Sequence, residues 1–551
     1  MKKHILICLA MLAMLPACGQ SDHNFEVAKQ LDILNSLYRQ LDIFYVDTLE
    51  ADKLVRVGID AMLESLDPYT EYYAEEDMDG LKQMTTGKYG GIGAVIRQRK
   101  DSTVMIVEPY AGMPASEVGL KAGDVMLKID DTDLKGKTSS EVSDMLRGEP
   151  GTTFVLRVRR YGETKTRDFK ITRRNIKIDP IPYFGMVSPN TGYISLTTFT
   201  EGCAKEMRKC IISLKEKGAE QIIIDLRSNG GGLLNEAVDM VNLFVPKGMD
   251  IVAMKGKLAA TDRTYTTNNE PLDLVIPIAV LVNGQTASAA EIVSGSLQDL
   301  DRAVVVGTKT FGKGLVQSTR ELPYSGGVKL TTAKYYIPSG RCIQAIDYKR
   351  LRDEEEAKRL RKTLPPVDSL KHIFHTAGGR EVKEGSGIMP DVVLTRDTVA
   401  NVVVYLSLDD VLTDWCAQYN AQHPTIPEVK DFTITDADYA SFKQYAKDHD
   451  FKYDRMSEKR LADLKKTAQF EGYYEDAKPE FEALEKKLAH NLEREMDKSE
   501  KDIRKIIAQE LMKRYYFQAG AVEESLKDDM DVEKAISVLN NKDEYKKILG
   551  K

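Results

Sequence analysis

Ser288 stands between an apolar run that resembles a strand, Ile278 to Val282, and one that resembles a helix, starting at Ala289. A serine at the mouth of a helix lies beside backbone N–H groups that have no helical partner. Such groups can stabilise the negative charge that develops on a carbonyl oxygen under attack. A serine here is equally compatible with a simple helix N-cap. This segment alone therefore leaves a nucleophile and a cap both open.

A second segment, 25 residues later, places Lys313 between Gly312 and Gly314, where a strand is predicted to begin. Residues two apart on a strand share a face, so Gln317 is expected on the side of Lys313, where it could orient the amine. A lysine with its ordinary pKa of about 10.4 is a poor base near neutral pH, but burial lowers that pKa. Lys313 could then take a proton from Ser288, although most lysines are exposed.

The third segment is the glycine-rich loop Asp225 to Gly232, between a predicted strand, Gln221–Leu226, and a predicted helix, Leu234–Phe244. Consecutive glycines let backbone amides approach a ligand closely, as an oxyanion hole requires. A phosphate-binding loop is the alternative, but the GK[ST] ending is missing. The loop therefore favours stabilisation of an oxyanion.

From about Pro182 onward, the elements that must position these residues alternate between strands and helices. This alternation predicts an α/β layer architecture with parallel connections, in which chemistry gathers at the carboxyl ends of the strands. The remaining predicted elements are strand Gly192–Leu196, helix Cys203–Lys217, helix Ala289–Leu300 and strand Ala303–Val306.

The flanking regions have other patterns. Residues Phe25 to Leu66 have apolar side chains at helical spacing, whereas residues 87–174 combine short alternating strands with turn residues. Beyond about residue 395 the sequence is helical and rich in Lys, Glu and Asp, as expected for solvated helix faces. At 551 residues the chain is long enough for several domains.

The first residues indicate export. Lys2 and Lys3 precede the apolar run Ile5 to Met14, which is too short to span a bilayer and is typical of a signal peptide. It ends in Leu15-Pro16-Ala17-Cys18, which resembles a lipobox and predicts lipidation of Cys18. An ordinary secretory signal is the alternative, and either one exports the chain.

Composition excludes some classes of function. The formal net charge is −7 and no basic stripe is present, so nucleic acid is not an expected partner. Cys203, Cys210, Cys342 and Cys416 have no CxxC spacing and are expected to be buried free thiols. His372 and His375 form no HExxH pattern, so we predict no metal site and no cofactor.

Together these segments resemble the carboxyl-terminal processing peptidases, the serine proteases of family S41. The resemblance covers roughly residues 25 to 395. Its further motifs occur in family order: Tyr45-Val46-Asp47, Ser65-Leu66-Asp67-Pro68, Gly90-Gly91-Ile92-Gly93 and Gly387-Ile388-Met389-Pro390-Asp391. One departure is Ala290, where many relatives have serine, but no expected role depends on it.

The resemblance implies a crotonase-like α/β core and a serine peptidase with a Ser-Lys dyad. Ser288 would be the nucleophile, Lys313 the general base and Gln317 the residue that positions the lysine. The oxyanion hole would combine the backbone amide of Ala289 with that of Gly232, or alternatively Gly231.

Residues 87–174 resemble a PDZ domain, including Gly119-Leu120-Lys121-Ala122-Gly123-Asp124. The loop amides of Gly91, Ile92, Gly93 and Ala94 could receive a terminal carboxylate while the next strand pairs with the peptide. A predicted helix, Ser139–Arg147, would close the groove with Val142 and Met145. Arg147 could help bind the carboxylate or signal occupancy; an ordinary surface arginine is the alternative.

The expected organisation has five parts: signal peptide and lipidated cysteine (1–18), N-terminal helical segment (19–86), PDZ domain (87–174), peptidase core (175–395) and helical C-terminal extension (396–551). The expected function is that of an endopeptidase of the cell envelope, lipid-anchored in the periplasm, which recognises apolar C-termini of exported proteins. The C-terminal helices could form a homodimer or bind an adaptor. The rival functions are a PDZ scaffold with an inactive core and a crotonase-like acyl-CoA enzyme, which the export signal disfavours.

Overall fold

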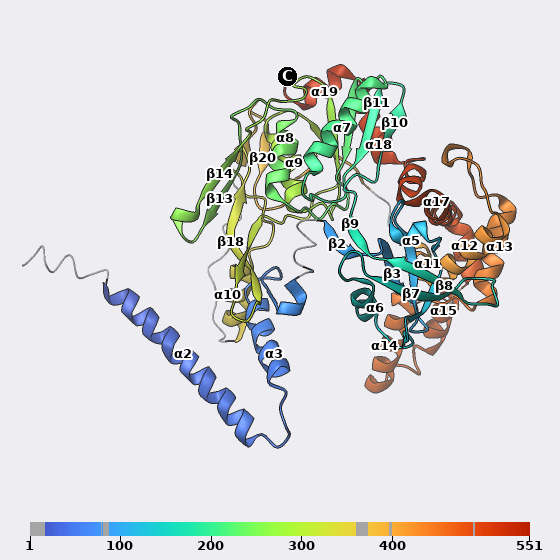
Figure 1. Ribbon diagram of the computed structural model, residues 1–551, viewed down its shortest axis with the longest axis horizontal. Helices are drawn as coiled ribbons and strands as arrows, with labels where there is room; N and C mark the ends of the chain where they lie inside the picture. The colour runs from blue at the N-terminus through green and yellow to red at the C-terminus, as the bar shows by residue number, and fades with distance from the viewer. Residues whose placement is uncertain are drawn as a thin grey trace, which may run out of the picture.

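The computed structural model describes residues 17–78, 80, 87–359, 373–395, 399–453, 455–488 and 491–551. The predicted signal peptide before Ala17 lies outside these ranges. Figure 1 shows a large α/β unit, a small β-domain (residues 88–177) and a helical domain (residues 401–526), with a long N-terminal helix that projects from the body. The predicted fold class, an α/β core with an inserted β-rich domain and helical ends, is confirmed.

The large unit is built on a six-stranded sheet whose neighbours are parallel except β10 and β11. Ile222 and Ile224 face one core and Ile223 faces another, so the central strands are buried on both faces. Burial on both faces explains the uninterrupted apolar runs in the sequence. In order the strands are β10 (Tyr183–Ser188), β11 (Thr191–Ser195), β12 (Gln221–Asp225), β15 (Ile278–Val282), β16 (Val304–Gly307) and β21 (Val392–Val393).

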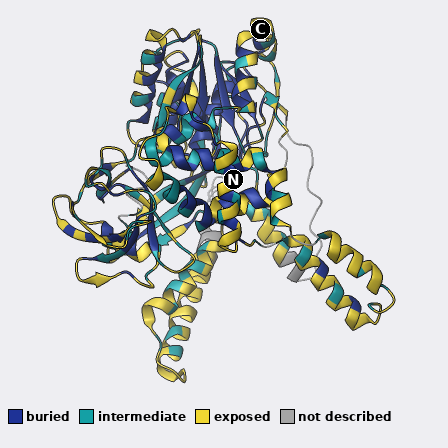
Figure 2. Cartoon of the chain, turned by 90° about the vertical axis from the view of Figure 1, so that its right-hand side faces the viewer, coloured by how far each residue is buried: buried dark blue, intermediate teal, exposed yellow. Residues whose placement is uncertain are grey.

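Helices from distant parts of the chain cover the two faces of this sheet. α7 (Cys203–Glu216), α8 (Leu234–Asn242) and α9 (Ala289–Asp299) pack on one face. The opposite face is covered by α18 (Met530–Asn540) and α19 (Lys542–Ile548), near the C-terminus. Figure 2 shows the buried residues, in dark blue, concentrated in this sheet and its helices. The last two helices thus pack on the large unit.

A second sheet brings the N-terminal segment to the large unit. Its central strand, β18 (Gly327–Tyr336), pairs with three others, and the nearest in sequence is β17 (Leu315–Glu321). The other members are β1 (Glu71–Tyr73), β13 (Asp250–Gly256) and β14 (Arg263–Thr266). Two short strands, β19 (Ile373–His375) and β20 (Glu381–Lys383), and helix α10 (Tyr348–Arg359) lie outside both sheets.

The small β-domain has a core of its own and joins the large unit through a two-stranded ribbon, β2 (Lys88–Gly91) and β9 (Arg174–Lys177). Strand β3 (Ala94–Gln98) is at the edge of its sheet. The other elements are β4 (Val104–Pro109), α5 (Pro114–Glu117), β5 (Val125–Ile129), β6 (Thr132–Asp133), α6 (Ser139–Leu146), β7 (Thr153–Arg159) and β8 (Arg167–Thr172).

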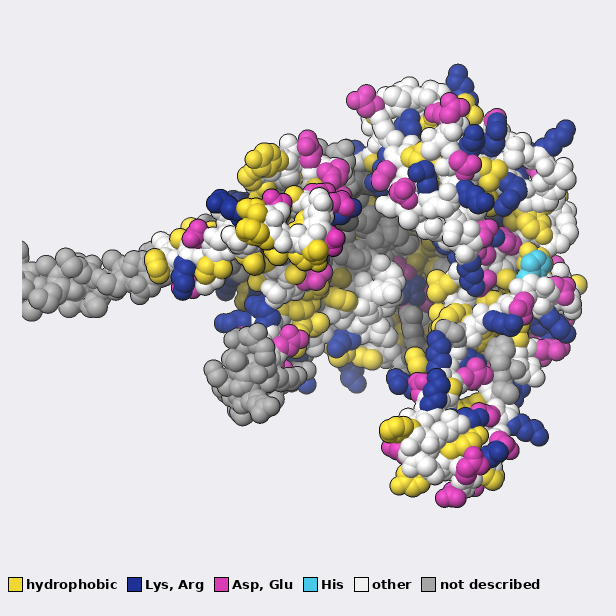
Figure 3. Space-filling model, turned by 90° about the horizontal axis from the view of Figure 1, so that it is seen from below, with side chains coloured by type: hydrophobic (Ala, Val, Ile, Leu, Met, Phe, Trp, Pro, Cys, Tyr) yellow, Lys and Arg dark blue, Asp and Glu magenta, His cyan; other side chains and the backbone are white. Residues whose placement is uncertain are grey.

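The N-terminal helical pattern is confirmed as α2 (Ala17–Phe44) and α3 (Ala51–Glu64), but most of its apolar side chains are exposed. Leu31, Leu34 and Phe44 are all more than half exposed, and hydrophobic side chains are visible along this projecting part in Figure 3. In the described part of the chain, no helix has the length and apolarity needed to cross a bilayer.

The helical domain is a bundle around Trp415 and Phe442. Cys416 lies in this core, and all four cysteines beyond the first helix are buried and free, as predicted. Its elements are α11 (Asn401–Leu408), α12 (Asp410–Gln422), η3 (Val429–Asp431), α13 (Asp436–Asp448), α14 (Met456–Glu471), α15 (Lys478–Leu488), α16 (Leu492–Lys498) and α17 (Glu500–Ser525).

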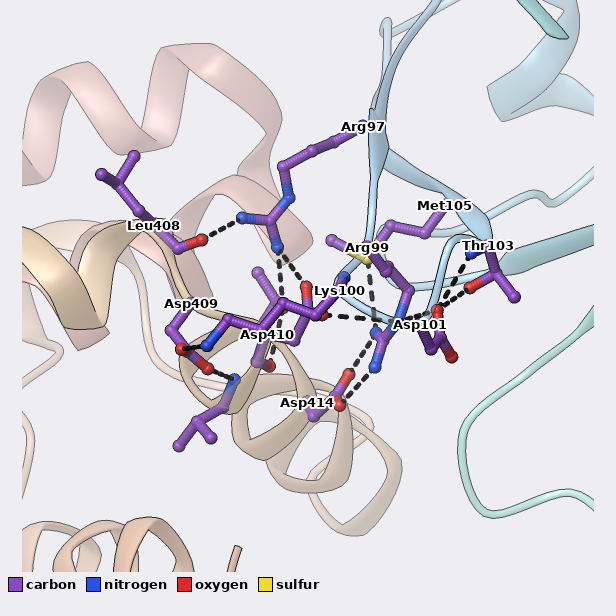
Figure 4. A network of polar contacts seen from close by, with 12 residues as sticks. Arg97, Arg99, Lys100, Asp101, Thr103, Met105, Leu408, Asp409, Asp410 and Asp414 are labelled. Carbon is purple, nitrogen blue, oxygen red and sulfur yellow. Dashed lines mark hydrogen bonds and ion pairs between the residues drawn. The ribbon is translucent and has the colours of Figure 1, made fainter. Parts of the chain in front are cut away.

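Ion pairs fasten the small β-domain to the start of α12 (Figure 4). The guanidinium of Arg99 donates to both carboxylate oxygens of Asp414, at 2.7 and 2.8 Å. Arg97, on edge strand β3, donates to Asp410 at 2.9 Å, and Lys100 pairs with Asp409. The Arg99 side chain is 14% exposed, so water screens its pair only partly.

We expect Arg99→Ala to loosen this junction. The substitution leaves the Asp414 carboxylate without its hydrogen-bond donors. The free energy of local opening of α12 should therefore fall by about 2 kcal/mol. Hydrogen exchange of α12 and β3 measures this. Arg157→Ala, which removes an exposed pair with Asp168 in the same domain, is the matched control and should leave α12 protection unchanged. Equal protection in both variants would contradict the prediction.

Candidate active site

Ser288 lies between β15 and α9, as predicted, in a strained backbone conformation. Its φ is +58°, a region that residues other than glycine rarely adopt. Ser288 is buried, and its side chain forms a hydrogen bond with that of Tyr335. The burial of Tyr335 raises the pKa of its phenol to about 12, and the hydrogen bond with Ser288 offsets part of that rise. A sharp turn from strand to helix therefore presents this serine to a phenol on β18.

The Glu291 carboxylate joins the serine turn to the lysine loop. One oxygen, Oε2, accepts hydrogen bonds from the backbone N–H groups of both Ser288, at 3.0 Å, and Lys313, at 2.8 Å. The other, Oε1, accepts from the Thr310 hydroxyl at 2.6 Å and the Gly312 amide at 2.8 Å. Because one atom bonds both backbones, the two residues that sequence analysis paired are held side by side.

The loop that carries Lys313 fits only with glycine before it. A Cβ on Gly312, whose φ is +85°, would lie 2.4 Å from the Cβ of Ala345. The late motif found in the sequence packs here too, because the Ile388 amide donates to the Thr310 hydroxyl at 2.6 Å. The loop is thus fixed from two sides.

The Lys313 amine is partly buried against a ring from the N-terminal segment. Its Nζ is 4.3 Å from the centre of the Tyr69 ring. Burial lowers the pKa of Lys313, and the positive charge of Lys329 lowers it further, whereas Glu71 acts in the opposite direction. The direction is the one that a general base near neutral pH requires.

Tyr69 is held in place by the motif that contains Asp67. The Asp67 carboxylate accepts hydrogen bonds from the amides of Tyr69 and Thr70, both at 2.9 Å, and the Thr70 hydroxyl accepts from the Thr331 amide on β18. This turn therefore belongs to the lysine site, a role that the sequence motif alone did not indicate.

The glycine loop lies against the serine turn. A Cβ on Gly231 would be 2.7 Å from that of Ser288 and 2.9 Å from the Ala289 nitrogen. The Gly231 amide is already used, because it donates to the Asn229 side chain at 2.8 Å. Within the described residues, the amides of Gly232 and Ala289 donate no hydrogen bond. These two amides are therefore available to an oxyanion.

Gln317 does not share a strand face with Lys313, contrary to the prediction. Strand β17 begins at Leu315, two residues after Lys313, and a bulge separates Val316 from Gln317, so the alternation does not extend from Lys313. The Gln317 side chain donates to the Leu315 carbonyl and the Thr331 hydroxyl, both at 3.3 Å. The expectation that Lys313 starts the strand was wrong by two residues.

A groove of about 230 Å³ lies between edge strand β3 and helix α6 in the small β-domain. Gly91, Ile92 and Ala94 line it, and the amides of Ile92 and Gly93 donate no hydrogen bond within the described residues. Arg147, at the end of α6, also lines it and lies over the Tyr89 ring at 5.8 Å. Four of the five residues predicted to receive a peptide terminus, all but Gly93, thus line one groove. Helix α6 contributes Ser143 and Leu146 to it instead of the predicted Val142 and Met145, and Val142 lies in the domain core.

Comparisons with known proteins agree with this arrangement. A family profile described as peptidase family S41 matches residues 190–349, and a PDZ-domain profile matches residues 105–160. The chain is 36% identical over 322 residues to the carboxy-terminal-processing protease of Bartonella bacilliformis, covering 58% of this chain and 73% of that protein. The chain belongs to peptidase family S41. It is thus a serine-type endopeptidase of the C-terminal processing class, and its small β-domain is a PDZ domain.

Other matches of this S41 peptidase cover different parts of its chain. A probable CtpA-like serine protease of Staphylococcus aureus is 36% identical over 318 residues, which are 57% of this chain and 62% of that protein. A profile described as the C-terminal helical domain of probable PDZ-proteases matches residues 402–539. Among solved structures, the photosystem II D1 C-terminal processing protease is 26% identical, with a TM-score of 0.34, over 66% of this chain and 92% of that one.

Sequence reasoning missed Glu291, Asn229 and Tyr69. Glu291 carried a usable signal, because Ser288-Ala-Ala-Glu291 has the S-x-x-E spacing of a capping box, in which the glutamate accepts from the backbone N–H at the helix start. Asn229 and Tyr69 also bond residues two positions away, but the contacts that join them to the site, with Ala287 and with the Lys313 amine, come from distant segments and leave no local signal.

Glu291→Gln should be damaging although it is nearly isosteric. An amide has one acceptor oxygen, so its NH₂ would face two of the four donors whichever way it is turned. We expect about 3 kcal/mol of lost stability from the unsatisfied donors, and a roughly 100-fold fall in kcat from the displaced serine and lysine backbones. Thermal unfolding and peptide cleavage measure the two effects.

Ser294→Ala is the control for this substitution, because Ser294 is buried on the same helix and its hydroxyl donates only to helix carbonyls, those of Ala290 and Glu291, and not to the Glu291 carboxylate. It should retain activity close to that of the wild type. A fully active Glu291→Gln variant would show that the carboxylate does not fix the site.

Proposed function

We propose that this S41 peptidase cleaves exported proteins by a Ser-Lys dyad, with Ser288 as nucleophile and Lys313 as general base. The observation that carries the proposal is the shared Glu291 oxygen, which accepts from the backbones of both residues. The lowered pKa of Lys313 supports the same assignment, because a base must be neutral to accept a proton.

In the proposed reaction, Lys313 takes the proton of the Ser288 hydroxyl as its oxygen bonds to the scissile carbonyl carbon. Lys313 then protonates the leaving amine as the C–N bond breaks, and water releases the acyl group by the same steps. The Ala289 and Gly232 amides hold the oxyanion. We favour Gly232 over Gly231 because Asn229 already occupies the Gly231 amide. Gln317 keeps the positioning role that the family resemblance implies, although its side chain here donates to the Leu315 carbonyl and the Thr331 hydroxyl.

We further propose that the PDZ groove binds the C-terminal end of the substrate. The amides of Ile92 and Gly93 would receive the terminal carboxylate, and edge strand β3 would pair with the peptide backbone. The lining by Ala94, Ile96 and Leu146 supports an apolar terminus. Arg147 adds a positive charge at the rim.

The predicted lipobox supports lipidation of Cys18 and a place at the periplasmic face of an envelope membrane. For contacts with a second copy or an adaptor, the C-terminal helices offer Phe470 and Tyr473, which are 94% and 66% exposed near the turn between α14 and α15. We also propose the five-part organisation predicted from the sequence, with segments 1–18, 19–86, 87–174, 175–395 and 396–551.

The decisive experiment is digestion of an unfolded exported protein by wild type, Ser288→Ala and Lys313→Ala. Each substitution should lower the cleavage rate at least about 10⁴-fold, because the nucleophile or its base is lost. Lys309→Ala, an exposed lysine in the same loop, is the control and should cleave normally. Undiminished cleavage by Ser288→Ala would refute the dyad, and inert wild type would favour a PDZ scaffold.

The charges around Lys313 predict opposite effects of two substitutions on pH dependence. Lys329 lowers the pKa of Lys313 through its positive charge and forms an ion pair with Glu71. Lys329→Gln removes both effects, so the pKa of Lys313 should rise. The acid limb of kcat/KM should then move to higher pH. Glu71→Gln should move it to lower pH. Shifts in the same direction in both variants would count against Lys313 as the base.

A further inference from the structure

The glycine loop of the active site is tied at its start to the C-terminal helix α18 through Arg227. The Arg227 guanidinium donates from Nη1 to Asp531 at 3.0 Å and to Asp529 at 3.1 Å, and Nη2 lies 2.8 Å from Asp529. Its Nε donates to Asp225 at 2.9 Å. One arginine therefore joins the end of β12 to a helix about 300 positions later in the chain.

The charges in this cluster favour the link. The side chains of Asp225, Asp529 and Asp531 are at most 12% exposed, and Arg227 is 16% exposed. Three carboxylates this close repel one another in a partly buried setting, and Arg227 is the cation that each of them contacts. The Asp225 carboxylate also accepts from the Tyr193 hydroxyl at 2.6 Å.

From Arg227 the link continues to the amide that would hold the oxyanion. Ser228 follows at a φ of +59° and its amide donates to the Asn283 side chain. The buried Asn229 then accepts from the Gly231 and Ala287 amides, and its side chain donates to the Leu196 carbonyl. Hydrogen bonds thus fix the loop along its length, and Arg227 anchors the end at which it leaves β12.

We propose that α18 is a positioning element of the active site: Asp529 and Asp531 hold Arg227, which holds the glycine loop in the shape that directs the Gly232 amide to the oxyanion. The proposal rests on the proposed oxyanion hole. Arg227, Asp529 and Asp531 are positioning residues, because none touches the reacting atoms. The C-terminal region then contributes to transition-state stabilisation in addition to covering the sheet.

The test uses the full-length chain, purified in detergent, with Asp531→Asn, Arg227→Gln and the double variant. Because loss of a complete oxyanion donor costs about 100-fold to 1000-fold in kcat, a displaced one should cost about tenfold or more, with KM little changed. Asp529→Ser should have a similar effect, since serine can still cap α18 but removes the carboxylate.

Two readouts separate positioning from general destabilisation. The rate at which a fluorophosphonate labels Ser288 should fall in proportion to kcat, because its phosphoryl oxygen occupies the oxyanion hole. Binding of a fluorescent C-terminal peptide to the PDZ groove should not change. The double variant should be no slower than Arg227→Gln, since both changes break one link. Lys534→Gln, which removes the pair of α18 with Glu544, is the control and should behave as wild type.

Additive losses in the double variant would overturn the proposal, as would variants that melt earlier but keep kcat and labelling at temperatures where they are folded. If wild type itself neither cleaves nor is labelled, the proposed dyad fails and this inference falls with it. If wild type is active and the Asp531 and Arg227 variants match it, the dyad stands and only this inference fails.

Discussion

The active site depends on one buried carboxylate. An ionised carboxylate away from water is costly unless hydrogen bonds satisfy it. Burial raises the pKa of Glu291, and four hydrogen bonds from two segments, the serine turn and the lysine loop with Thr310, oppose that rise. Because the acceptor is negative, each of these bonds is stronger than a neutral one. The serine turn and the lysine loop therefore cannot shift independently without leaving part of a buried charge unsatisfied.

The same requirement explains why so much of the chain converges on one small site. The Asp67 turn supplies the ring beside Lys313, the late motif supplies the amide that bonds Thr310, and α18 supplies the carboxylates that hold Arg227. Backbone groups in a catalytic loop are not fixed by regular secondary structure, so side chains from elsewhere must bond them. Glu291 and Asn229 perform that task inside the site. The three distant segments hold the side chains beside them, those of Lys313, Thr310 and Arg227.

The central part of the fold could be predicted because its strands are buried on both faces and its glycines mark close backbone approach. Strand Ile278–Val282 and the helix starting at Ala289 were predicted with correct starts, and Ser288 with them. Gln317 could not be placed, because a bulge breaks the alternation without changing the apolar pattern. The position of α18 against the central sheet could not be predicted either. Val532, Ala535 and Val538 indicate a buried face, but not which surface covers it.

The PDZ domain is held at two ends, which constrains how a bound peptide could affect catalysis. The β2–β9 ribbon ties it to the large unit, and the Arg97, Arg99 and Lys100 pairs tie the far end of β3 and the following loop to α12. Helix α12 packs on α17, which also contacts β10 of the large unit. A peptide that adds to β3 therefore pairs with a strand anchored to the helical domain, so that any rotation of the PDZ domain must either break these ion pairs or carry the helical domain with it.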